Sequence, residues 1–477
     1  MSKCENFFSS AAIVHFLVLM FGAGAWIAVN GVWVELPVIV YSTPEGWTLP
    51  SYLTVILQIG NIGPVLVTVM QTFYPKYFHQ NAMIYSIVGI GTLSCLLLSF
   101  FWDTTAFIAG QSRSVALFAL WFCLSFVDCT SSVTFLPFMT TFQALFLSTY
   151  FIGEGLSGLL PSIFALAQGV QNVQCVNTSH TNATTNVTTY SIVAEYENAR
   201  FSADIFFVLL CIMMLGCGMA FVLLNHLGVA QKFYAPPQPK YIKVKTTNNP
   251  DEEGTGFYNS VEMSSSGSTT PANLDSRISV IGKPETDQSA SATVLLSAKS
   301  NQLTRGNYAY LLVIIFFVNC ISNGALPAVS SYSSLPYGSL AYHLSACLGN
   351  MANPVACFIA VFLPMQSFVG NGVFTLISAA LGSYLMLLAV QSPCPILINE
   401  TTGTVLMILA QILFVGSVSY IKISIAQIFR SRGHKKSLIW YGAVVQAGSL
   451  IGALIMFPMV NVYSLFISSV PCDKSCF

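Results

Sequence analysis

Polar side chains recur at helical spacing inside otherwise apolar stretches of this chain. Trp26, Asn30 and Trp33 are spaced i, i+4 and i+7, so they share one face of a helix. Asn and Gln offer a hydrogen-bond donor and acceptor side by side, and Trp offers a flat stacking surface. This combination suits an uncharged, flat solute better than an inorganic ion. The same kind of spacing relates further candidates for substrate binding, namely Gln58, Asn61, Asn319, Asn323, His343 and Asn350.

Ionisable side chains inside the apolar stretches form a second group of candidates. A charged residue at the centre of a membrane helix costs about 2.5–3.5 kcal/mol on insertion scales, so such residues mark functional sites by default. For Asp128 and Glu154, a structural hydrogen bond between helices is an alternative of equal weight. Lys422 is expected to extend toward the lipid headgroups. The residues that we interpret as candidates for proton uptake and release are Glu35, Asp128, Glu154 and His343.

Catalytic and metal-binding motifs are absent from the sequence. It contains no GxSxG, HExxH or Walker A motif and no Gly-rich dinucleotide fingerprint. Its 13 cysteines show no CxxC spacing and no Cys/His pattern that is typical of zinc sites. We therefore expect no enzyme activity, no metal site and no bound cofactor.

The composition places the polar candidates in a membrane. Of the 477 residues, 54% are hydrophobic and only 8% are charged, whereas a soluble domain carries about 25% charged residues. With 18 basic and 18 acidic residues, the chain gives no reason to expect nucleic-acid binding. The first apolar stretch is too long for a signal peptide, so we expect it to stay as a span. A helix that spans a membrane needs roughly 20 apolar residues. Apolar stretches of about this length occur eleven times, at 12–34, 51–73, 82–101, 114–136, 146–170, 203–225, 308–327, 338–362, 369–390, 403–425 and 439–460.

A polar segment divides these stretches into two halves. Residues 228–307 are rich in Ser, Thr, Pro, Lys and Glu, which predicts a disordered cytoplasmic loop. We therefore predict an N-terminal half over 1–227 with six spans and a C-terminal half over 308–477 with five.

The two halves repeat one another in sequence. Each matched pair of motifs is separated by six spans, so that the paired helices run in the same direction across the bilayer. Such a parallel repeat is typical of major-facilitator-type transporters. We therefore expect an all-α integral membrane protein with eleven transmembrane helices, similar to major-facilitator or equilibrative nucleoside transporters. The matched motifs are centred on Asn30 and Asn323, Asn61 and Asn350, Ser132 and Ser417, and Gly155 and Gly448.

Glycosylation motifs and basic residues predict the orientation. With a cytoplasmic N-terminus and an extracellular C-terminus, the four N-x-[ST] motifs at Asn177, Asn182, Asn186 and Asn399 all face outside. Most basic residues then face the cytoplasm. The same orientation exposes four cysteines to the oxidising side. Among them we favour a Cys394–Cys472 disulfide, although four cysteines allow three complete pairings and free thiols are an alternative.

Several of these motifs resemble a known family. The segments from Asn30 to Pro37 (NGVWVELP), from Val127 to Phe138 (VDCTSSVTFLPF) and from Gly153 to Pro161 (GEGLSGLLP) are similar to the eukaryotic riboflavin transporters, solute carrier family 52. The resemblance extends from about residue 15 to 465, and Asp128-Cys129-Thr130 is most similar to the acid-stimulated third type. It implies eleven spans.

The resemblance also implies a function. It implies uptake of riboflavin at the plasma membrane by alternating access, independent of sodium and stimulated by external acid. The expected partners are riboflavin and the bilayer, with no obligate protein partner. Trp26 or Trp33 would stack on the isoalloxazine ring, and Asn or Gln would bind its uracil-like edge. The ribityl chain would bind hydroxyl groups from among Ser131, Ser132 and Thr134, and Glu35, Asp128 or His343 would sense acid.

Two other functions stay open from the residues alone. A carrier of nucleosides or of another flat heterocycle would share the architecture and the kind of cavity. A cell-surface receptor is the second alternative, although the commonest kind has seven spans and no parallel repeat.

Overall fold

A computed structural model of the chain describes residues 2–108, 110–170, 172–181, 188–197, 199–234, 303–363, 365–432 and 437–468. The described residues on both sides of the 235–302 gap pack into one compact unit. Most of the segment predicted to be disordered, 228–307, falls in that gap and so lies outside the described residues. Its two ends are helical, in α9 (Gly228–Gln231) and at the start of α11 (Arg305–Asn319).

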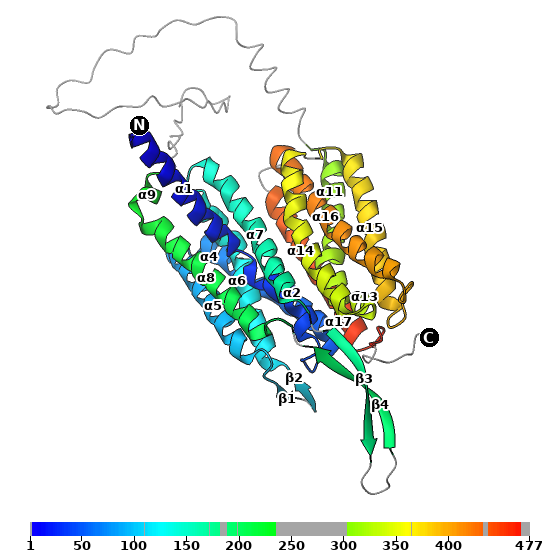
Figure 1. The fold of residues 1–477 in the computed structure, drawn as a ribbon. Coiled ribbons are helices and arrows are strands. Elements are labelled where there is room, and N and C mark those ends of the chain that lie inside the picture. Colours follow the sequence, from blue (N-terminus) through cyan, green and yellow to red (C-terminus); the bar gives the residue numbers. More distant parts are fainter. Residues whose placement is uncertain are drawn as a thin grey trace, which may run out of the picture. The chain divides into compact units, whose positions relative to one another are not determined.

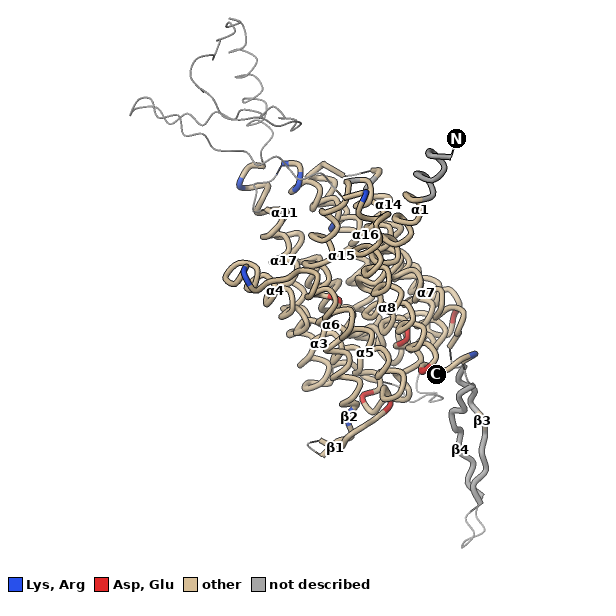
Figure 2. Tube along the Cα trace, turned by 90° about the vertical axis from the view of Figure 1, so that its left-hand side faces the viewer, with Lys and Arg blue, Asp and Glu red and all other residues tan. Residues whose placement is uncertain are grey.

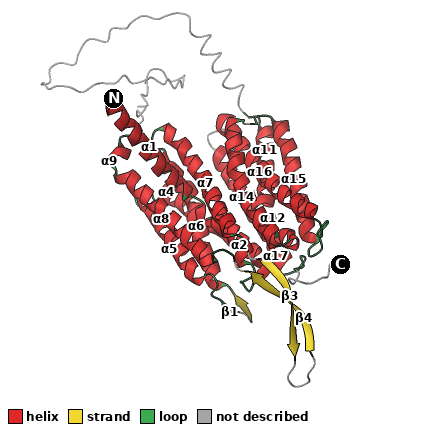
Figure 3. Cartoon of the chain, viewed as in Figure 1, coloured by secondary structure: helices red, strands yellow, loops and turns green. Residues whose placement is uncertain are grey.

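The structure is almost entirely helical before the gap, apart from two β-hairpins (Figures 1 and 3). The hairpins pair β1 (Ala106–Ile108) with β2 (Gln111–Arg113), and β3 (Asn172–Thr181) with β4 (Thr188–Glu197). A 3-10 turn, η1, covers Gly46–Thr48. The helices are α1 (Ser2–Ala23), α2 (Ile27–Ile39), α3 (Leu49–Gly60), α4 (Ile62–Phe73), α5 (Gln80–Phe101), α6 (Val115–Met139), α7 (Ala144–Gln168) and α8 (Ala203–His226).

After the gap the described residues form helices alone. A π-helical turn, η2 (Cys320–Ala325), continues α11, and a 3-10 turn, η3 (Leu335–Tyr337), precedes α14. The remaining helices are α12 (Leu326–Ala328), α13 (Ser330–Ser334), α14 (Ser339–Phe362), α15 (Phe368–Val390), α16 (Thr401–Arg432) and α17 (Ser437–Asn461).

The expected all-α membrane architecture is confirmed, but the count of eleven spans is not. Within the described residues, nine helices are long and apolar enough to cross a bilayer, and the bent pair α1–α2 makes a tenth. The span expected at 338–362 does form the helix α14, which carries His343, Asn350 and Asn353 and is not among these ten. Many large apolar side chains on the outer surface are exposed, as a lipid environment requires.

Three of the expected spans are interrupted near their polar motifs. Span one bends by 55° between α1 and α2, just before Ile27. Span two changes from α3 to α4 at Asn61, and span seven passes through the π-helical turn that holds Asn323. Single π-helical turns inside α-helices are frequent at functional sites. These interruptions place the polar motifs at local breaks in the helices.

The helices pack as two groups, α1–α8 and α11–α17 (Figure 1). In the first group α1 packs on α7 and α5 packs on α6 and α8, while in the second α11 packs on α17 and α16 on α14 and α15. The groups meet where α14 packs on α7 and α2 and where α17 packs on α3. Glycines permit two equivalent close approaches, because a Cβ at Gly153 would clash with the backbone oxygen of Leu19 and one at Gly448 with that of Phe316.

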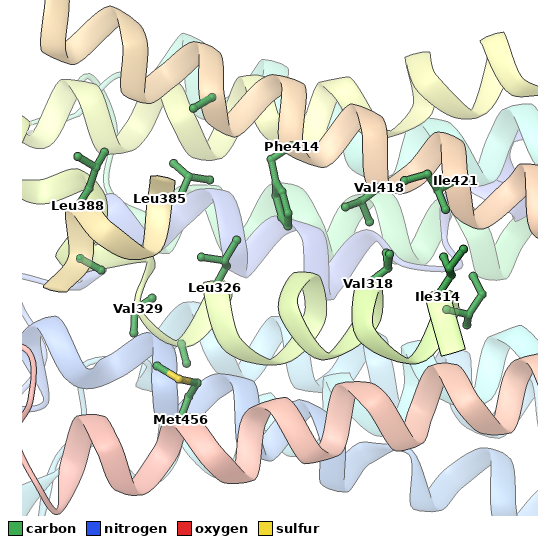
Figure 4. Close-up of a cluster of buried hydrophobic side chains, with 14 of the residues drawn as sticks. Ile314, Val318, Leu326, Val329, Leu385, Leu388, Phe414, Val418, Ile421 and Met456 are labelled. Atoms are coloured by element: carbon green, nitrogen blue, oxygen red, sulfur yellow. The ribbon is translucent and has the colours of Figure 1, made fainter. Parts of the chain in front are cut away.

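A cluster of buried apolar side chains holds the second group together (Figure 4). It joins α11 and α12 to α15, α16 and α17, so that Phe414 of α16 lies among side chains from several helices. Burial of this kind fixes the wall of the neighbouring cavity. Its labelled members are Ile314, Val318, Leu326, Val329, Leu385, Leu388, Phe414, Val418, Ile421 and Met456.

Candidate functional site

A cavity of about 530 Å³ lies between the two groups of helices. Its volume falls within the roughly 300–1,000 Å³ that is usual for small-molecule sites. Residues of α2, α3, η2, α14, α16 and α17 line it, so both groups contribute. The predicted binding residues that it brings together are Trp26, Asn30, Trp33, Gln58, Asn61, Asn323 and Asn350.

Two asparagines occupy equivalent positions in the two groups. Asn30 donates a hydrogen bond from Nδ2 to Ser157 Oγ on α7, at 3.3 Å. Asn323 donates from Nδ2 to Ser449 Oγ on α17, at 3.2 Å. Both serines belong to the motifs that the sequence pairs between spans five and eleven. The repeat predicted from sequence is therefore present in the hydrogen bonds that hold the cavity wall.

Two further hydrogen bonds cross between the groups in a similarly related way. Gln58 of α3 donates from Nε2 to the backbone oxygen of Asn323, at 3.4 Å. Asn350 of α14 donates from Nδ2 to the backbone oxygen of Asn30, at 3.5 Å. Spans two and eight thus each reach the interrupted first span of the other half. These long hydrogen bonds are weak, so the amides are available to a ligand.

The two predicted tryptophans lie at different heights along span one. Trp26 is the residue before the first turn of α2, and Trp33 lies two turns further along. Both are partly exposed to the cavity. Trp33 packs edge-on against Trp121, with ring centroids 6.0 Å apart. This contact holds the indole of Trp33 in place while part of it faces the cavity.

Asp128 and Ser131 on α6 hold the bend in span one. Asp128 is buried, and its Oδ2 accepts a hydrogen bond from the backbone N–H of Val29 at 2.8 Å. Ser131 Oγ donates to the backbone oxygen of Ala25 at 2.8 Å. The carboxylate thereby acts as an N-cap of α2 from another helix. The other carboxylate oxygen of Asp128 is buried without a hydrogen-bond partner within the described residues.

Five other predicted binding residues lie away from the cavity lining. Glu35 is buried, and its Oε1 accepts a hydrogen bond from Gln168 at 2.9 Å. Asn319 donates to the backbone oxygen of its own helix at Ile315, and Thr134 does the same to Thr130. Ser132 is exposed on α6, and His343 is buried beside Cys347. Helical spacing places these residues on the correct segments, but their side chains point to other faces.

The ionisable residues Glu154 and Lys422 differ in their surroundings. The side chain of Glu154 on α7 is half-buried, and its carboxylate has no hydrogen-bond or ion-pair partner within the described part of the chain. Lys422 on α16 lines the cavity and donates from Nζ to Asn323 Oδ1, at 3.1 Å. The expectation that Lys422 extends toward the lipid headgroups is wrong, because the cavity offers its ammonium group a fixed acceptor.

Sequence reasoning missed a row of hydroxyl and amide groups on the cavity wall. The serine-rich run after Pro327 contributes several of the hydroxyls, and Gln411 and Gln446 stand alone in apolar helices as Lys422 does. An isolated amide within an apolar span was the signal that could have identified both glutamines. The hydroxyl groups on the wall belong to Ser322, Ser330, Ser333, Ser334, Tyr342, Ser345, Ser419 and Ser449.

The described residues contain no metal site, and the predicted modification sites that they include do not line this cavity. Among the residues that the structure describes, no group of three or more His, Cys, Asp or Glu side chains could hold a metal ion. Asn399 is exposed in the loop after α15. Asn177 lies in β3, and Asn182, Asn186 and Cys472 lie outside the described residues, so glycosylation and the Cys394–Cys472 disulfide stay predictions.

Comparisons of sequence give one consistent result. Residues 10–468 match the family described as "Solute carrier family 52, riboflavin transporter". "Riboflavin transporter 2" of Salmo salar is 43% identical over 479 residues, which cover 97% of this chain and 99% of that protein. "Solute carrier family 52, riboflavin transporter, member 3" of Homo sapiens is 38% identical over 492 residues, covering 98% and 99%.

Comparisons of structure identify the fold. A peptide transporter of the POT family aligns with a TM-score of 0.54 at 11% identity, covering 94% of this chain and 90% of that one. A mutant of the nucleoside transporter NupG aligns with a TM-score of 0.52 at 10% identity, covering 94% and 92%. At such low identity the likeness shows the fold alone. The expected major-facilitator type of fold is confirmed.

Proposed function

This chain belongs to solute carrier family 52, the riboflavin transporters, and we propose that its central cavity binds riboflavin and releases it on the opposite side of the plasma membrane. Family membership over nearly the whole chain identifies a transporter rather than an enzyme. The single observation that carries the assignment to the cavity is the pair Asn30 and Asn323. They bring equivalent amides from the two groups of helices to one space.

The chemistry of riboflavin fits the lining of this cavity. Its isoalloxazine ring is flat and largely apolar, and Trp26 and Trp33 offer it indole surfaces. Its uracil-like edge carries donors and acceptors that match the amides of Asn30 and Asn323. Its ribityl chain needs hydroxyl partners. The serines after Pro327 supply them better than Ser132 and Thr134, which lie outside the cavity lining.

Contacts at one end of the helices support alternating access. We call this end, at which Val40, Leu49 and Gly338 lie, the hairpin side, because β1 and β2 lie there (Figure 1). Tyr41 and Ser339 share a hydrogen bond of 3.0 Å there. Contacts of this kind close the hairpin side of the cavity, so we infer that riboflavin leaves toward the other side in this conformation.

Two more contacts reinforce the closure on the hairpin side. Asn461 of α17 donates from Nδ2 to Ser51 Oγ of α3, at 2.7 Å. The rings of Trp47 and Tyr332 meet with centroids 5.7 Å apart. Both contacts join a residue of the first group to one of the second. Loading of riboflavin from the hairpin side requires that all three contacts break.

We place the hairpin side outside the cell, with a cytoplasmic N-terminus and an extracellular C-terminus. Exposed Asn399 lies in the loop after α15, on the hairpin side, where its predicted glycan would face outward. Arg305 begins α11, and Arg430 and Arg432 lie in the last turn of α16. Figure 2 shows blue segments, which mark Lys and Arg, at the end of the helices away from β1 and β2. This distribution agrees with the excess of basic residues expected on the cytoplasmic side.

For stimulation by external acid we favour Asp128 among the four predicted candidates. Its carboxylate touches the first turn of α2, the helix that carries Asn30 and Trp33. A change in its protonation therefore acts on the wall of the cavity, whereas Glu35 and His343 lie behind it. Uptake measured at acidic and at neutral external pH, with and without sodium, tests this. Loss of the acid response in Asp128→Asn, with uptake at neutral pH retained, is the expected result.

Nucleosides are the second substrate class to be tested, because NupG shares the fold. That likeness shows the fold alone, so the test is direct competition. Excess riboflavin or lumiflavin is expected to inhibit uptake of labelled riboflavin, and excess uridine is not. Inhibition by uridine alone would assign the cavity to nucleosides.

A further inference from the structure

Lys422 brings the only charge to the described residues that line the cavity. It lies inside α16, on the face toward η2, and its Nζ is 3.1 Å from Asn323 Oδ1. No carboxylate lies within ion-pair distance of this ammonium group in the described part of the chain. Within the described residues, the cavity of a carrier for an uncharged solute therefore contains one cation, and the one protein acceptor that it contacts is neutral.

Such an arrangement leaves the charge under-compensated. An ammonium group has three N–H donors, and Asn323 takes one of them. Burial of a charge away from water costs several kcal/mol unless other partners supply hydrogen bonds. The remaining donors therefore favour acceptor atoms of whatever occupies the cavity.

Neighbouring hydrogen bonds hold the acceptor of Lys422 in place. The amide nitrogen of Asn323 donates to Asn319 Oδ1 at 3.1 Å and to Ser449 Oγ at 3.2 Å. Its backbone oxygen accepts from Gln58. With Nδ2 engaged in this way, Oδ1 of Asn323 has a fixed direction toward Lys422. The lysine is thus a donor positioned in advance of ligand binding, which limits the entropy that binding would cost.

We propose that Lys422 binds a pair of adjacent acceptor atoms in the transported solute and so determines its specificity. This inference rests on the proposed function, and for riboflavin the pair is ring nitrogen N1 and the carbonyl oxygen on C2. That pair carries two acceptors side by side and no proton. Neutral amides such as Asn30 suit the adjacent part of the ring, which alternates donor and acceptor. Lys422 thereby distinguishes the two ends of the uracil-like edge.

A chemical double-mutant cycle tests the assignment on the full chain in lipid nanodiscs. The two ligands are riboflavin and an analogue with a C–H group in place of ring nitrogen N1, and binding is followed by quenching of flavin fluorescence. The protein variants are Lys422→Gln and, as a matched control, Lys232→Gln, whose lysine is exposed outside the cavity. Replacement of Lys422 is expected to weaken riboflavin binding by about tenfold or more, as loss of a hydrogen bond to a charged group does.

Comparison of riboflavin with the analogue shows whether Lys422 contacts ring nitrogen N1 directly or only supports the structure of the site. The unaltered chain and Lys232→Gln are expected to prefer riboflavin to the analogue by a similar factor, and Lys422→Gln is expected to bind both equally. Equal weakening of both ligands by Lys422→Gln, or no weakening of either, overturns the assignment. Unchanged binding with loss of transport also overturns it, because Lys422 would then act in a step other than ligand binding. Failure of the unaltered chain to bind riboflavin would instead overturn the proposed function.

Discussion

The carboxylate of Asp128 accepts a hydrogen bond at 2.8 Å from the backbone N–H of Val29, across the boundary between α6 and α2. The N-terminus of a helix carries unpaired N–H groups and a partial positive charge. A carboxylate from another helix satisfies both, and it does so where span one bends by 55°. The residues that follow the bend, Asn30 and Trp33, line the cavity. Asp128 therefore orients one wall of the site without lining it.

Replacing Asp128 by Leu is expected to reduce uptake and thermal stability together. Loss of an N-cap costs about 0.5–2 kcal/mol, so the melting temperature should fall by a few degrees. Asp128→Asn keeps an acceptor oxygen and is the matched control, with stability near that of the unaltered chain. Thermal unfolding of the purified variants measures the difference. Equal stability of Leu and Asn variants would contradict a capping role.

Substitution of either Asn30 or Asn323 by Ala is expected to weaken riboflavin binding to a similar degree. Each amide takes part in an equivalent hydrogen bond on the cavity wall, and loss of one costs about 1–3 kcal/mol, or roughly 5- to 150-fold in Kd. Equilibrium binding to the purified chain measures it. Asn81→Ala is the control, because Asn81 is exposed away from the cavity. Unchanged binding in both variants would remove these asparagines from the site.

The two cavity tryptophans should differ from lipid-facing ones in their response to flavin. Stacking of an indole on isoalloxazine quenches fluorescence, so Trp26→Phe or Trp33→Phe is expected to reduce the quenching that riboflavin causes. Trp440→Phe serves as the control, because Trp440 is 58% exposed on α17. Titration of tryptophan fluorescence measures the effect. If only the Trp440 variant changed the signal, neither cavity tryptophan would be a stacking partner.

A cross-link on the hairpin side should stop transport reversibly. Ser51 and Asn461 lie in hydrogen-bond contact across the two groups of helices. With cysteine at both positions, oxidation is expected to hold the hairpin side closed and to abolish uptake, and reduction is expected to restore it. The single-cysteine variants control for the substitutions themselves. Full uptake by the oxidised pair, with the cross-link shown on a gel, would mean that this side need not open.

The sequence predicts the scaffold of the site better than the direction of its side chains. The repeat relates Asn30 to Asn323 because the same Asn-Gly and Leu-Pro elements occur in both spans, and the structure gives both asparagines the same partner type. Helical spacing also placed Trp26 and Trp33 correctly. Glu35 follows Trp33 by two residues and so lies on another face of α2, where its carboxylate accepts a hydrogen bond from Gln168 away from the cavity.

Residues whose role depends on contacts between distant helices were harder to predict. Lys422 was assigned to the headgroups from its place near a helix end, whereas its position is decided by Asn323 on another helix. The serines after Pro327 lie between two predicted spans, so the sequence predicts a short loop there. No apolar periodicity indicates that α13 forms part of a cavity wall. Asp128 was identified as exceptional from its burial in an apolar span. Its partner, the backbone of α2, leaves no signal in the sequence.

Uptake of labelled riboflavin by cells that express this chain is the most direct test of the central claim. Saturable uptake that unlabelled riboflavin and lumiflavin inhibit, that uridine does not inhibit, and that Asn30→Ala and Asn323→Ala both reduce is the predicted result. Surface labelling of each variant ensures that the comparison concerns transport rather than expression. Absence of riboflavin uptake by a chain that is present at the surface would contradict the account.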